Sequence, residues 1–431
     1  MRRSLLFFGL RIGSTVLATV WSFLLTYTLV RQIGLQDYAF LAAVIAFASL
    51  VLQADLGISV RLFGRMRQNF VDPTKGDAAD LRSAAVTALI GYSLAALLAT
   101  LVFTLVLEIW QLGPVTHGLA IILFFGGSVL PLPWMVLRIA SNAHDQYVIT
   151  EAIDCGRRAL LLLLTAALAY GLPLLDYTIG FLLLWIAALL VLARLAQRRF
   201  GLFTGTSIRR GWQVLREDGR EIAGSASLSL SDFLIYIFPY YALLAAKAGA
   251  TALIAFDMFY KVTRFGGTAF FTVTETLLPH QTRTYHAGDT NGLARLMGLS
   301  FLLCAGPCLV AATLIYVWGD EIFGTLLGHP DIVSAQMQLA ICFMLFFMML
   351  KAVSGAVLAG IGELRPLARR ASTALAAMLV FAAISGISGW SIDIFVTGYV
   401  LLYAGQATSY FLLMLKVMRG LRAASPAAQP A

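Results

Sequence analysis

Charge is what this sequence has least of. Only 12% of its 431 residues are Asp, Glu, Lys or Arg, whereas a soluble domain carries about 25%. A soluble protein of this length would need several domains with almost uncharged surfaces, which excludes that class. The 60% hydrophobic content and mean hydropathy of +0.84 indicate a chain that lies mostly in a membrane. The net charge of +9 then belongs to loops beside anionic lipid, and no nucleic-acid binding is expected.

Motifs for metals, nucleotides and catalysis are also missing. The four cysteines form no CxxC pair, and Cys304 and Cys308 have no nearby His, so we expect no metal site. Neither a Walker A sequence nor HExxH occurs. The segment with His144, Glu151 and Asp154 is rich in ionisable groups but lacks a nucleophile turn, which favours a short amphipathic connector over a hydrolase site. We therefore predict no catalytic residues, no enzyme activity and no cofactor.

Long apolar runs are what the sequence has in quantity. About 20 apolar residues of helix cross a bilayer, and these runs are too long and too uniformly apolar for the alternating strands of a barrel. Only helices or closed barrels satisfy their backbone in lipid. The sequence therefore predicts an all-α polytopic membrane protein with twelve transmembrane helices, at residues 5–30, 38–60, 84–107, 118–140, 159–175, 177–196, 224–246, 250–279, 295–318, 333–360, 371–390 and 392–416.

Basic residues alternate between the segments that join these spans. Of the 31 Lys and Arg residues, only Arg31 and Lys247 fall in the even-numbered segments. Cytoplasmic loops of membrane proteins carry the excess of Lys and Arg, so both termini are predicted to be cytoplasmic. Four cations lie well inside predicted spans, away from the span ends, and they mark where function is sought: Arg11, Lys261, Arg264 and Lys351.

The longest basic loop divides the chain into two halves. We predict a six-helix lobe at 1–200, a basic cytoplasmic linker at 201–223, a second six-helix lobe at 224–420, and a disordered tail at 421–431. Two halves with even numbers of spans have the same orientation. An axis along the membrane normal would relate them around a central cavity, as in parallel-repeat transporters.

The eighth span carries the sharpest local signal. Asp257, Lys261, Arg264 and Glu275 fall within roughly 60° of one another at about 100° per residue. Such groups cost at least ~2.5–3.5 kcal/mol each at the membrane centre, so they must face protein or water. Two alternatives stay open here. Asp257 and Lys261 could form a structural ion pair, and Glu275 could lie in the headgroup region.

Four further charges lie inside or at the end of other spans. Arg11 is in the first span and either faces the cavity or extends to the cytoplasmic interface. Asp55 ends the second span and either lines the cavity or lies among headgroups. Asp232, in the seventh span, is either a proton or cation site or a partner for Arg264. Lys351 lies inside the tenth span.

Several short motifs occur in a fixed order along this twelve-span chain. The motifs are GLQDY at 34–38, QADLG at 53–57, LPH at 278–280, GD at 288–289 and SGAVLAGIGE at 354–363. Together they resemble the MOP superfamily and, within it, the polysaccharide-biosynthesis flippases. They are similar to the family's entry and exit of the second helix, its exit of the eighth helix with the loop that follows, and its exit of the tenth.

The resemblance implies a MATE/MOP-like fold and a function. Two six-helix lobes would alternate access to a cationic cavity and carry a polyprenyl-(pyro)phosphate-linked oligosaccharide across the bacterial inner membrane for O-antigen, lipopolysaccharide or exopolysaccharide biosynthesis. The surroundings would be membrane lipids, and a polysaccharide polymerase or ligase would be a partner. Pyrophosphate contacts are expected at Arg264 and Lys261, then Arg11 and Lys351. Gating or coupling to H⁺ or Na⁺ is expected at Asp232, Asp257, Glu275 and Asp55.

Two other functions remain as alternatives. A cation-coupled multidrug or metabolite antiporter would have the same fold, with an unpaired carboxylate and aromatics in one lobe and fewer central cations. The two deep cations Lys261 and Arg264 favour an anionic substrate instead. A membrane-embedded glycan enzyme would need a large loop outside the membrane, and the short even-numbered segments argue against one.

Overall fold

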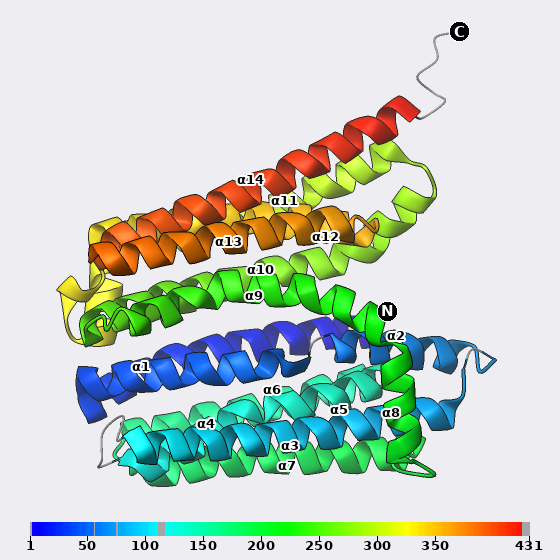
Figure 1. The fold of residues 1–431 in the computed structure, drawn as a ribbon, viewed down its shortest axis with the longest axis horizontal. Helices are drawn as coiled ribbons and strands as arrows, with labels where there is room; N and C mark the ends of the chain where they lie inside the picture. The colour runs from blue at the N-terminus through cyan, green and yellow to red at the C-terminus, as the bar shows by residue number, and fades with distance from the viewer. Residues whose placement is uncertain (1, 56, 75, 111–116, 425–431) are drawn as a thin grey trace. The chain divides into compact units, whose positions relative to one another are not determined.

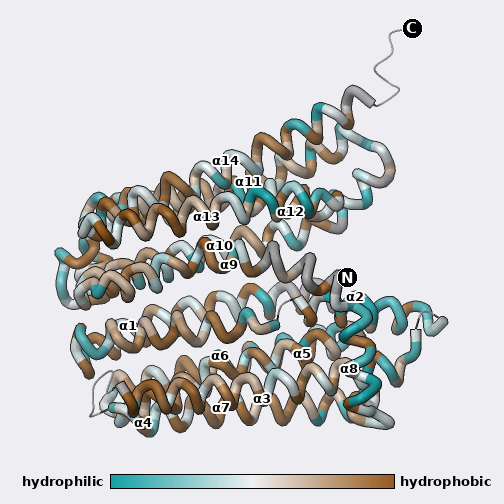
Figure 2. The backbone as a smooth tube through the Cα atoms, in the orientation of Figure 1, coloured by the Kyte–Doolittle hydropathy of each residue, from teal (hydrophilic) through white to brown (hydrophobic). Residues whose placement is uncertain are grey.

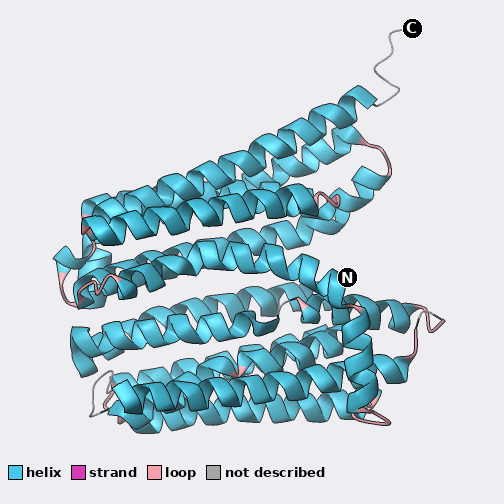
Figure 3. Cartoon of the chain, viewed as in Figure 1, coloured by secondary structure: helices cyan, strands magenta, loops and turns pink. Residues whose placement is uncertain are grey.

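The computed structural model describes residues 2–55, 57–74, 76–110 and 117–424, and almost all of them are helical (Figure 3). Within those ranges there is no strand, so the all-α prediction is confirmed. The helices are α1 (Arg2–Val51), η1 (Leu52–Asp55), α2 (Ile58–Val71), α3 (Ala78–Trp110), α4 (Gly118–Val129), α5 (Pro131–Ala143), α6 (Tyr147–Ala169), α7 (Leu174–Phe200), α8 (Ile208–Glu217), α9 (Gly219–Ala245), α10 (Ala250–His286), α11 (Thr290–Leu327), η3 (Pro330–Ile332), α12 (Ala335–Gly360), α13 (Leu364–Ser388) and α14 (Ile392–Ala424).

The chain divides into two compact units, Met1–Leu230 and Ser231–Ala431. The first unit contains α1 to α8, and the second contains α10 to α14 (Figure 1). Helix α9 begins in the first and ends in the second. Helix α14 runs to Ala424, so the start of the predicted tail is helical, and residues 425–431 lie outside the described chain.

Eight helices in the described ranges are long and apolar enough to cross a membrane. Figure 2 shows the hydrophobic colours along them. One of the eight is α1, which covers the first predicted span and most of the second because it continues through Gly34 at φ 80° and ψ 170°. The remaining predicted spans lie on α6, α9 and α10. Each predicted span therefore falls largely on helix.

Two predicted spans are interrupted helices, and the sequence did not predict the interruptions. The span at 38–60 ends as α1 at Val51, passes through the 3₁₀ turn η1, and restarts as α2 after Gly57 at φ 78°. A left-handed backbone at this break suits glycine, which lacks a Cβ. The span at 118–140 is divided into α4 and α5 where Pro131 begins the second helix. Proline cannot donate the backbone hydrogen bond that would continue α4.

The predicted linker at 201–223 is not an open loop. It contains helix α8 and the first residues of α9. Helix α8 crosses one end of α3 instead of running beside it (Figure 1). The Ser207 backbone N–H donates to Ser83 Oγ at 3.1 Å, and the buried Gly211 lies against Ser83.

The core of the second unit surrounds the first turns of α10. Residues 253–260 are all buried, whatever side of the helix they face. The Phe256 ring meets the Tyr240 ring edge-on at 5.0 Å and the Tyr399 ring at 6.4 Å. This aromatic packing holds the N-terminal half of α10 and fixes where its charged side chains lie.

Candidate functional site

The first two charges on α10 form a buried ion pair. Lys261 Nζ lies 2.6 Å from Asp257 Oδ2, and the Tyr240 hydroxyl donates to Asp257 Oδ1. The Asp257 side chain is 3% exposed and that of Lys261 12%. The structure therefore has the ion pair that the sequence left as an alternative. Tyr240 was not identified as its third member.

Arg264 lies on the same face of α10, where that face becomes exposed. Its guanidinium lies over the Tyr260 ring, with Cζ 5.9 Å from the ring centroid. Within the described part of the chain, no carboxylate lies at ion-pair distance from it. The exposed face continues one and three turns later with Thr268 and Glu275. Arg264 thus presents an accessible positive charge beside a buried, neutralised pair.

A second cluster joins three helices of the same unit. Lys351 of α12 donates to Asp232 Oδ1 of α9 at 2.8 Å, and Gln406 Nε2 of α14 donates to the same oxygen at 3.2 Å. The Lys351 ammonium also lies 5.1 Å from the Tyr403 ring centroid and 5.7 Å from that of Tyr410. Asp232 therefore pairs with Lys351, and not with Arg264 as one alternative had it.

In the first unit, Arg11 belongs to a cluster around a buried acid. Arg11 Nη1 lies 2.9 Å from Glu151 Oε1, and Arg138 Nη2 donates to the same oxygen. The Glu151 side chain is 1% exposed, whereas that of Arg11 is 33% exposed. The Arg11 guanidinium thus contacts α6, while about a third of the side chain is exposed.

The neighbouring acid on α6 also holds two arginines. Asp154 accepts from Arg157 at 2.6 Å, from Arg158 at 2.8 Å and from the Ser14 hydroxyl at 2.9 Å. The Arg157 guanidinium lies 3.7 Å from the Trp185 ring centroid. The segment predicted as a short connector is thus the end of α5 and the start of α6, where Glu151 and Asp154 are buried. The i,i+3 and i,i+4 spacing of these charges was a usable signal.

Asp55 has a different environment. It is 8% exposed, and its Oδ1 accepts from the Tyr92 hydroxyl at 2.8 Å and from the Ser59 backbone N–H at 3.1 Å. No Lys, Arg or His in the described ranges lies at ion-pair distance from it. The sequence did not single out Tyr92, which comes from α3. The next residue, Leu56, is outside the described residues.

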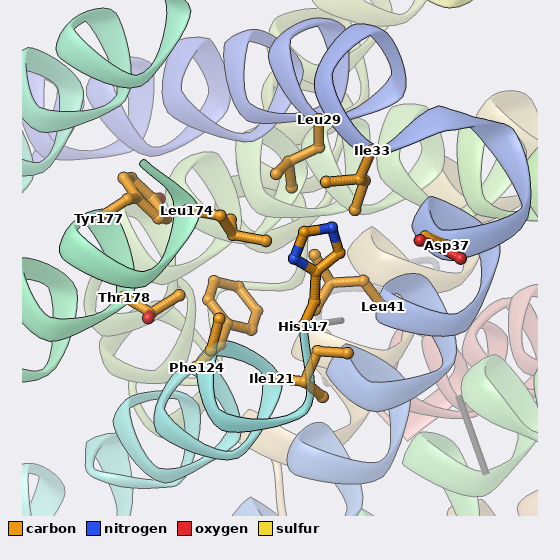
Figure 4. Close-up of a pocket in the computed structure, with 11 residues that line it drawn as sticks. Leu29, Ile33, Asp37, Leu41, His117, Ile121, Phe124, Leu174, Tyr177 and Thr178 are labelled. Carbon is orange, nitrogen blue, oxygen red and sulfur yellow. The ribbon is translucent and has the colours of Figure 1, made fainter. Parts of the chain in front are cut away.

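An apolar pocket lies elsewhere in the first unit, between α1, α4 and α7. Figure 4 shows the His117 ring among Leu29, Ile33 and Phe124, with Asp37 at one side. None of the predicted cations lines it. The pocket was not predicted from the sequence, because its walls come from three helices that lie far apart along the chain.

The described cysteines are free thiols, and no group of three or more His, Cys, Asp or Glu in the described ranges could hold a metal ion. The ionisable residues gather instead in the clusters above, where cations and carboxylates meet. That chemistry suits ion pairing and anion or cation binding.

Comparison with known proteins indicates the class of protein to which this fold is similar. No family model matches the sequence, and no curated protein matches it. The structure is similar to the inward-facing form of a multidrug resistance MATE family transporter of the MOP superfamily. The TM-score is 0.68 at 12% identity, covering 97% of this chain and 99% of that one.

Two further structures agree. The Vibrio cholerae MATE transporter VcmN, as a mutant, gives a TM-score of 0.67 at 16% identity, covering 97% of this chain and 98% of that one. A MOP superfamily transporter from Pyrococcus furiosus, described as having a binding pocket of reverse polarity that suggests a different function, gives 0.64 at 13%, covering 97% and 96%.

The chain therefore has the fold of a multi-pass membrane transporter. More narrowly, its structural neighbours are MATE transporters of the MOP superfamily, so the predicted MATE/MOP-like architecture is confirmed. These neighbours are transporters and not enzymes. At such identities the likeness establishes the fold, and the cargo is a separate question.

Proposed function

We propose that this chain flips a polyprenyl-(pyro)phosphate-linked oligosaccharide across the bacterial inner membrane by alternating access, with both termini cytoplasmic. The observation that carries the proposal is Arg264, an exposed guanidinium on α10 with no carboxylate at ion-pair distance among the described residues. An intramembrane charge of this kind is expensive unless it serves a ligand or a water-filled path.

Arginine is suited to such a substrate. Its planar guanidinium binds phosphate oxygens through two parallel hydrogen bonds, and these charge-assisted bonds are the stronger kind. Lys261 lies about one helical turn before Arg264, and a diphosphate there would compete with Asp257 for the lysine ammonium. The exposed Thr268 and Glu275 extend a hydrophilic stripe that a glycan could follow while the polyprenyl tail stays in lipid.

The other two cations predicted to contact phosphate form ion pairs with acidic side chains. Arg11 is paired with Glu151, and Lys351 with Asp232. We infer that these pairs act as gates, because opening one of them frees a cation for the passing phosphate. The flipped product would pass to a polysaccharide polymerase or ligase for assembly of a cell-surface glycan.

The test compares arginine variants of the full protein in proteoliposomes that hold a fluorescent polyprenyl-diphosphate oligosaccharide. Arg264→Gln should slow transfer between leaflets by roughly ten- to a hundredfold, since a hydrogen bond to a charged group is worth about 1.5–3 kcal/mol. Arg264→Lys should retain part of the rate. Arg283→Gln, which removes an exposed arginine from the same helix, is the matched control and should leave the rate unchanged. Wild-type transfer by Arg264→Gln, at equal protein incorporation, would refute the site.

A cation-coupled antiporter remains the second candidate, and Asp55 favours it. A buried carboxylate with no basic partner at ion-pair distance among the described residues is costly unless it binds a proton or cation. If it couples transport, Asp55→Asn should abolish acceleration by an imposed H⁺ or Na⁺ gradient, and Tyr92→Phe should weaken it. Glu108→Gln, an exposed acid on α3, is the control. Gradient-driven uptake of cationic drugs, with no transfer of the lipid-linked glycan, would select the antiporter.

A further inference from the structure

Helix α8 has hydrophobic side chains that are not buried against the rest of the protein. Gly211 and Val214 are buried against the rest of the first unit, but Ile208 and Trp212 are 60% and 64% exposed. An exposed tryptophan on a charged helix is unusual unless something covers it, because large aromatic rings are mostly buried. Figure 2 shows α8 mostly in the hydrophilic colours.

The residues of α8 divide into three sectors. At about 100° per residue, Gly211 and Val214 share the side that faces the protein. Ile208 and Trp212 lie next to them, within roughly 40° of each other. The basic sector follows immediately with Arg209 and Arg216, both exposed. An apolar stripe bordered by arginines is typical of helices that lie in a membrane interface.

Contacts at both ends of α8 hold the helix in one orientation relative to α2 and α3, so the side on which Ile208 and Trp212 lie is fixed. At the start, the Ser207 backbone N–H donates to Ser83 Oγ of α3 at 3.1 Å. Just after the end, Asp218 accepts from Arg61 at 3.1 Å and from Arg65 at 2.8 Å, both on α2. Burial raises the pKa of the Asp218 carboxyl, but hydrogen bonds from these arginines outweigh it and hold the pKa below its ordinary value. The Asp218 carboxylate is therefore charged at neutral pH, and its ion pairs with Arg61 and Arg65 are formed.

The position of α8 along α3 indicates what covers the exposed Ile208 and Trp212. Ser83 and Thr87, which contact the start of α8, lie where the apolar part of α3 begins. Beyond them α3 exposes a run of apolar side chains that lipid must cover: Ile90, Leu94, Leu97, Leu98, Leu101, Val102, Leu105 and Ile109. Helix α8 therefore borders the lipid-facing surface at the level of the headgroups, where tryptophan is enriched in membrane proteins.

Positive charge collects at the same level. The exposed arginines of α7 and α8 include Arg194, Arg198, Arg199, Arg209, Arg210 and Arg216. Such clusters beside a membrane attract anionic lipid. We propose that α8 is an interfacial helix that inserts Ile208 and Trp212 between acyl chains and binds the phosphates of anionic phospholipids through Arg209 and Arg216. This proposal does not depend on the transported substrate.

The experiment places a bimane fluorophore at single cysteines in the full chain, after the four native cysteines are replaced by alanine and folding is verified. Trp212→Cys reports the apolar sector, and Gln213→Cys, the next residue, reports the exposed polar side. The protein is reconstituted in discs that contain either nitroxide-labelled phosphatidylglycerol or nitroxide-labelled phosphatidylcholine. Aqueous iodide is the water-side quencher.

The label at 212 should be quenched several-fold more by lipid nitroxide than by iodide, and the label at 213 should show the reverse order. Quenching at 212 should favour phosphatidylglycerol over phosphatidylcholine. Combining Arg209→Gln with Arg216→Gln should reduce this preference by about fivefold for each arginine removed. Combining Arg365→Gln with Arg369→Gln, which removes two exposed arginines from α13, should leave it unchanged.

Three results would overturn the proposal. Equal iodide quenching at 212 and 213 would place α8 in water. Equal quenching by the two lipids would mean that the arginines do not select anionic headgroups. Protection of position 212 from both lipid nitroxide and iodide would mean that protein, and not lipid, covers this face.

Discussion

At the scale of single residues, most intramembrane charges of this protein are paired. Lys261 and Lys351 each meet an aspartate, and Arg11 meets a glutamate. Each pair satisfies a charge that would otherwise be costly in a low-dielectric setting. Arg264 and Asp55 differ, because the described residues supply neither with an oppositely charged partner at ion-pair distance. This contrast is what directs the functional proposals to those two side chains.

His144, outside the spanning helices, offers a pH-sensitive contact. Its ring stacks on Phe200 at 4.1 Å between centroids and meets the Phe70 ring edge-on at 5.4 Å. Its Nδ1 lies 2.8 Å from the Ala140 carbonyl, so Nδ1 is the donor. The imidazole thus joins α5 to the ends of α2 and α7.

Burial is the main cause that lowers the pKa of His144 below its ordinary value of 6.5. The Ala140 carbonyl and Asp145 oppose this effect, while the charges of Arg82 and Arg67 add to it. The folded protein therefore binds this proton less readily than the unfolded chain does. The stabilisation by neutral His144 is complete above pH 6.5 and is lost as the pH falls below it.

We predict that the melting temperature of the wild type falls more steeply between pH 7.5 and 5.5 than that of His144→Phe. Phenylalanine keeps the ring packing and has no proton to bind. The readout is the slope with pH, because loss of the Ala140 hydrogen bond will lower the absolute melting temperature of the variant. His280→Phe, at an exposed position on α10, should retain the wild-type slope. Parallel slopes for the wild type and His144→Phe would contradict this assignment.

At the scale of elements, a glycine determines how α8 packs on α3. A Cβ at Gly211 would lie 2.1 Å from Thr87 Oγ1 and 2.2 Å from the Ser83 backbone oxygen. The second contact is with backbone, which cannot rotate away. Close packing of the two helices at this crossing therefore requires the smallest residue.

We predict that Gly211→Ala displaces α8 from α3, at a cost of about 1–3 kcal/mol, as for other overpacked sites. The displaced helix should be cut faster by trypsin after Arg209 and Arg210. Gln213→Ala changes an exposed residue of the same helix and should be cut at the wild-type rate. Unchanged cleavage of Gly211→Ala would show that the crossing can adapt.

At the scale of the whole molecule, the alternation of basic loops makes a prediction about orientation. Cytoplasmic loops retain lysine and arginine because translocating them is unfavourable. Cysteine placed at Thr204, between α7 and α8, should react with a membrane-impermeant maleimide only after cells are opened. Cysteine placed at Asp331, in η3, should react in intact spheroplasts. Reaction in the opposite order would invert the proposed topology.

Sequence alone determined that this protein is an all-helical membrane protein and indicated which segments form most of its long apolar helices. Scarcity of charge, runs of about 20 apolar residues and alternating basic loops suffice, because the bilayer imposes the same requirements along the whole chain. The breaks after Val51 and at Leu130 were not predicted, because apolar residues continue on both sides of each break. Helix α8 was missed because ten amphipathic residues within a basic loop fall far short of a span.

Only the tertiary structure decided which charges meet. Arg11 and Glu151 are 140 positions apart, as are Ser14 and Asp154, and Asp232 is 119 positions from Lys351. No local periodicity encodes contacts between helices so distant along the chain. The Asp257–Lys261 pair was foreseeable because it lies within one turn of a single helix. Pairing neutralises some cations and leaves Arg264 without a carboxylate in the described residues, and that difference arises from packing.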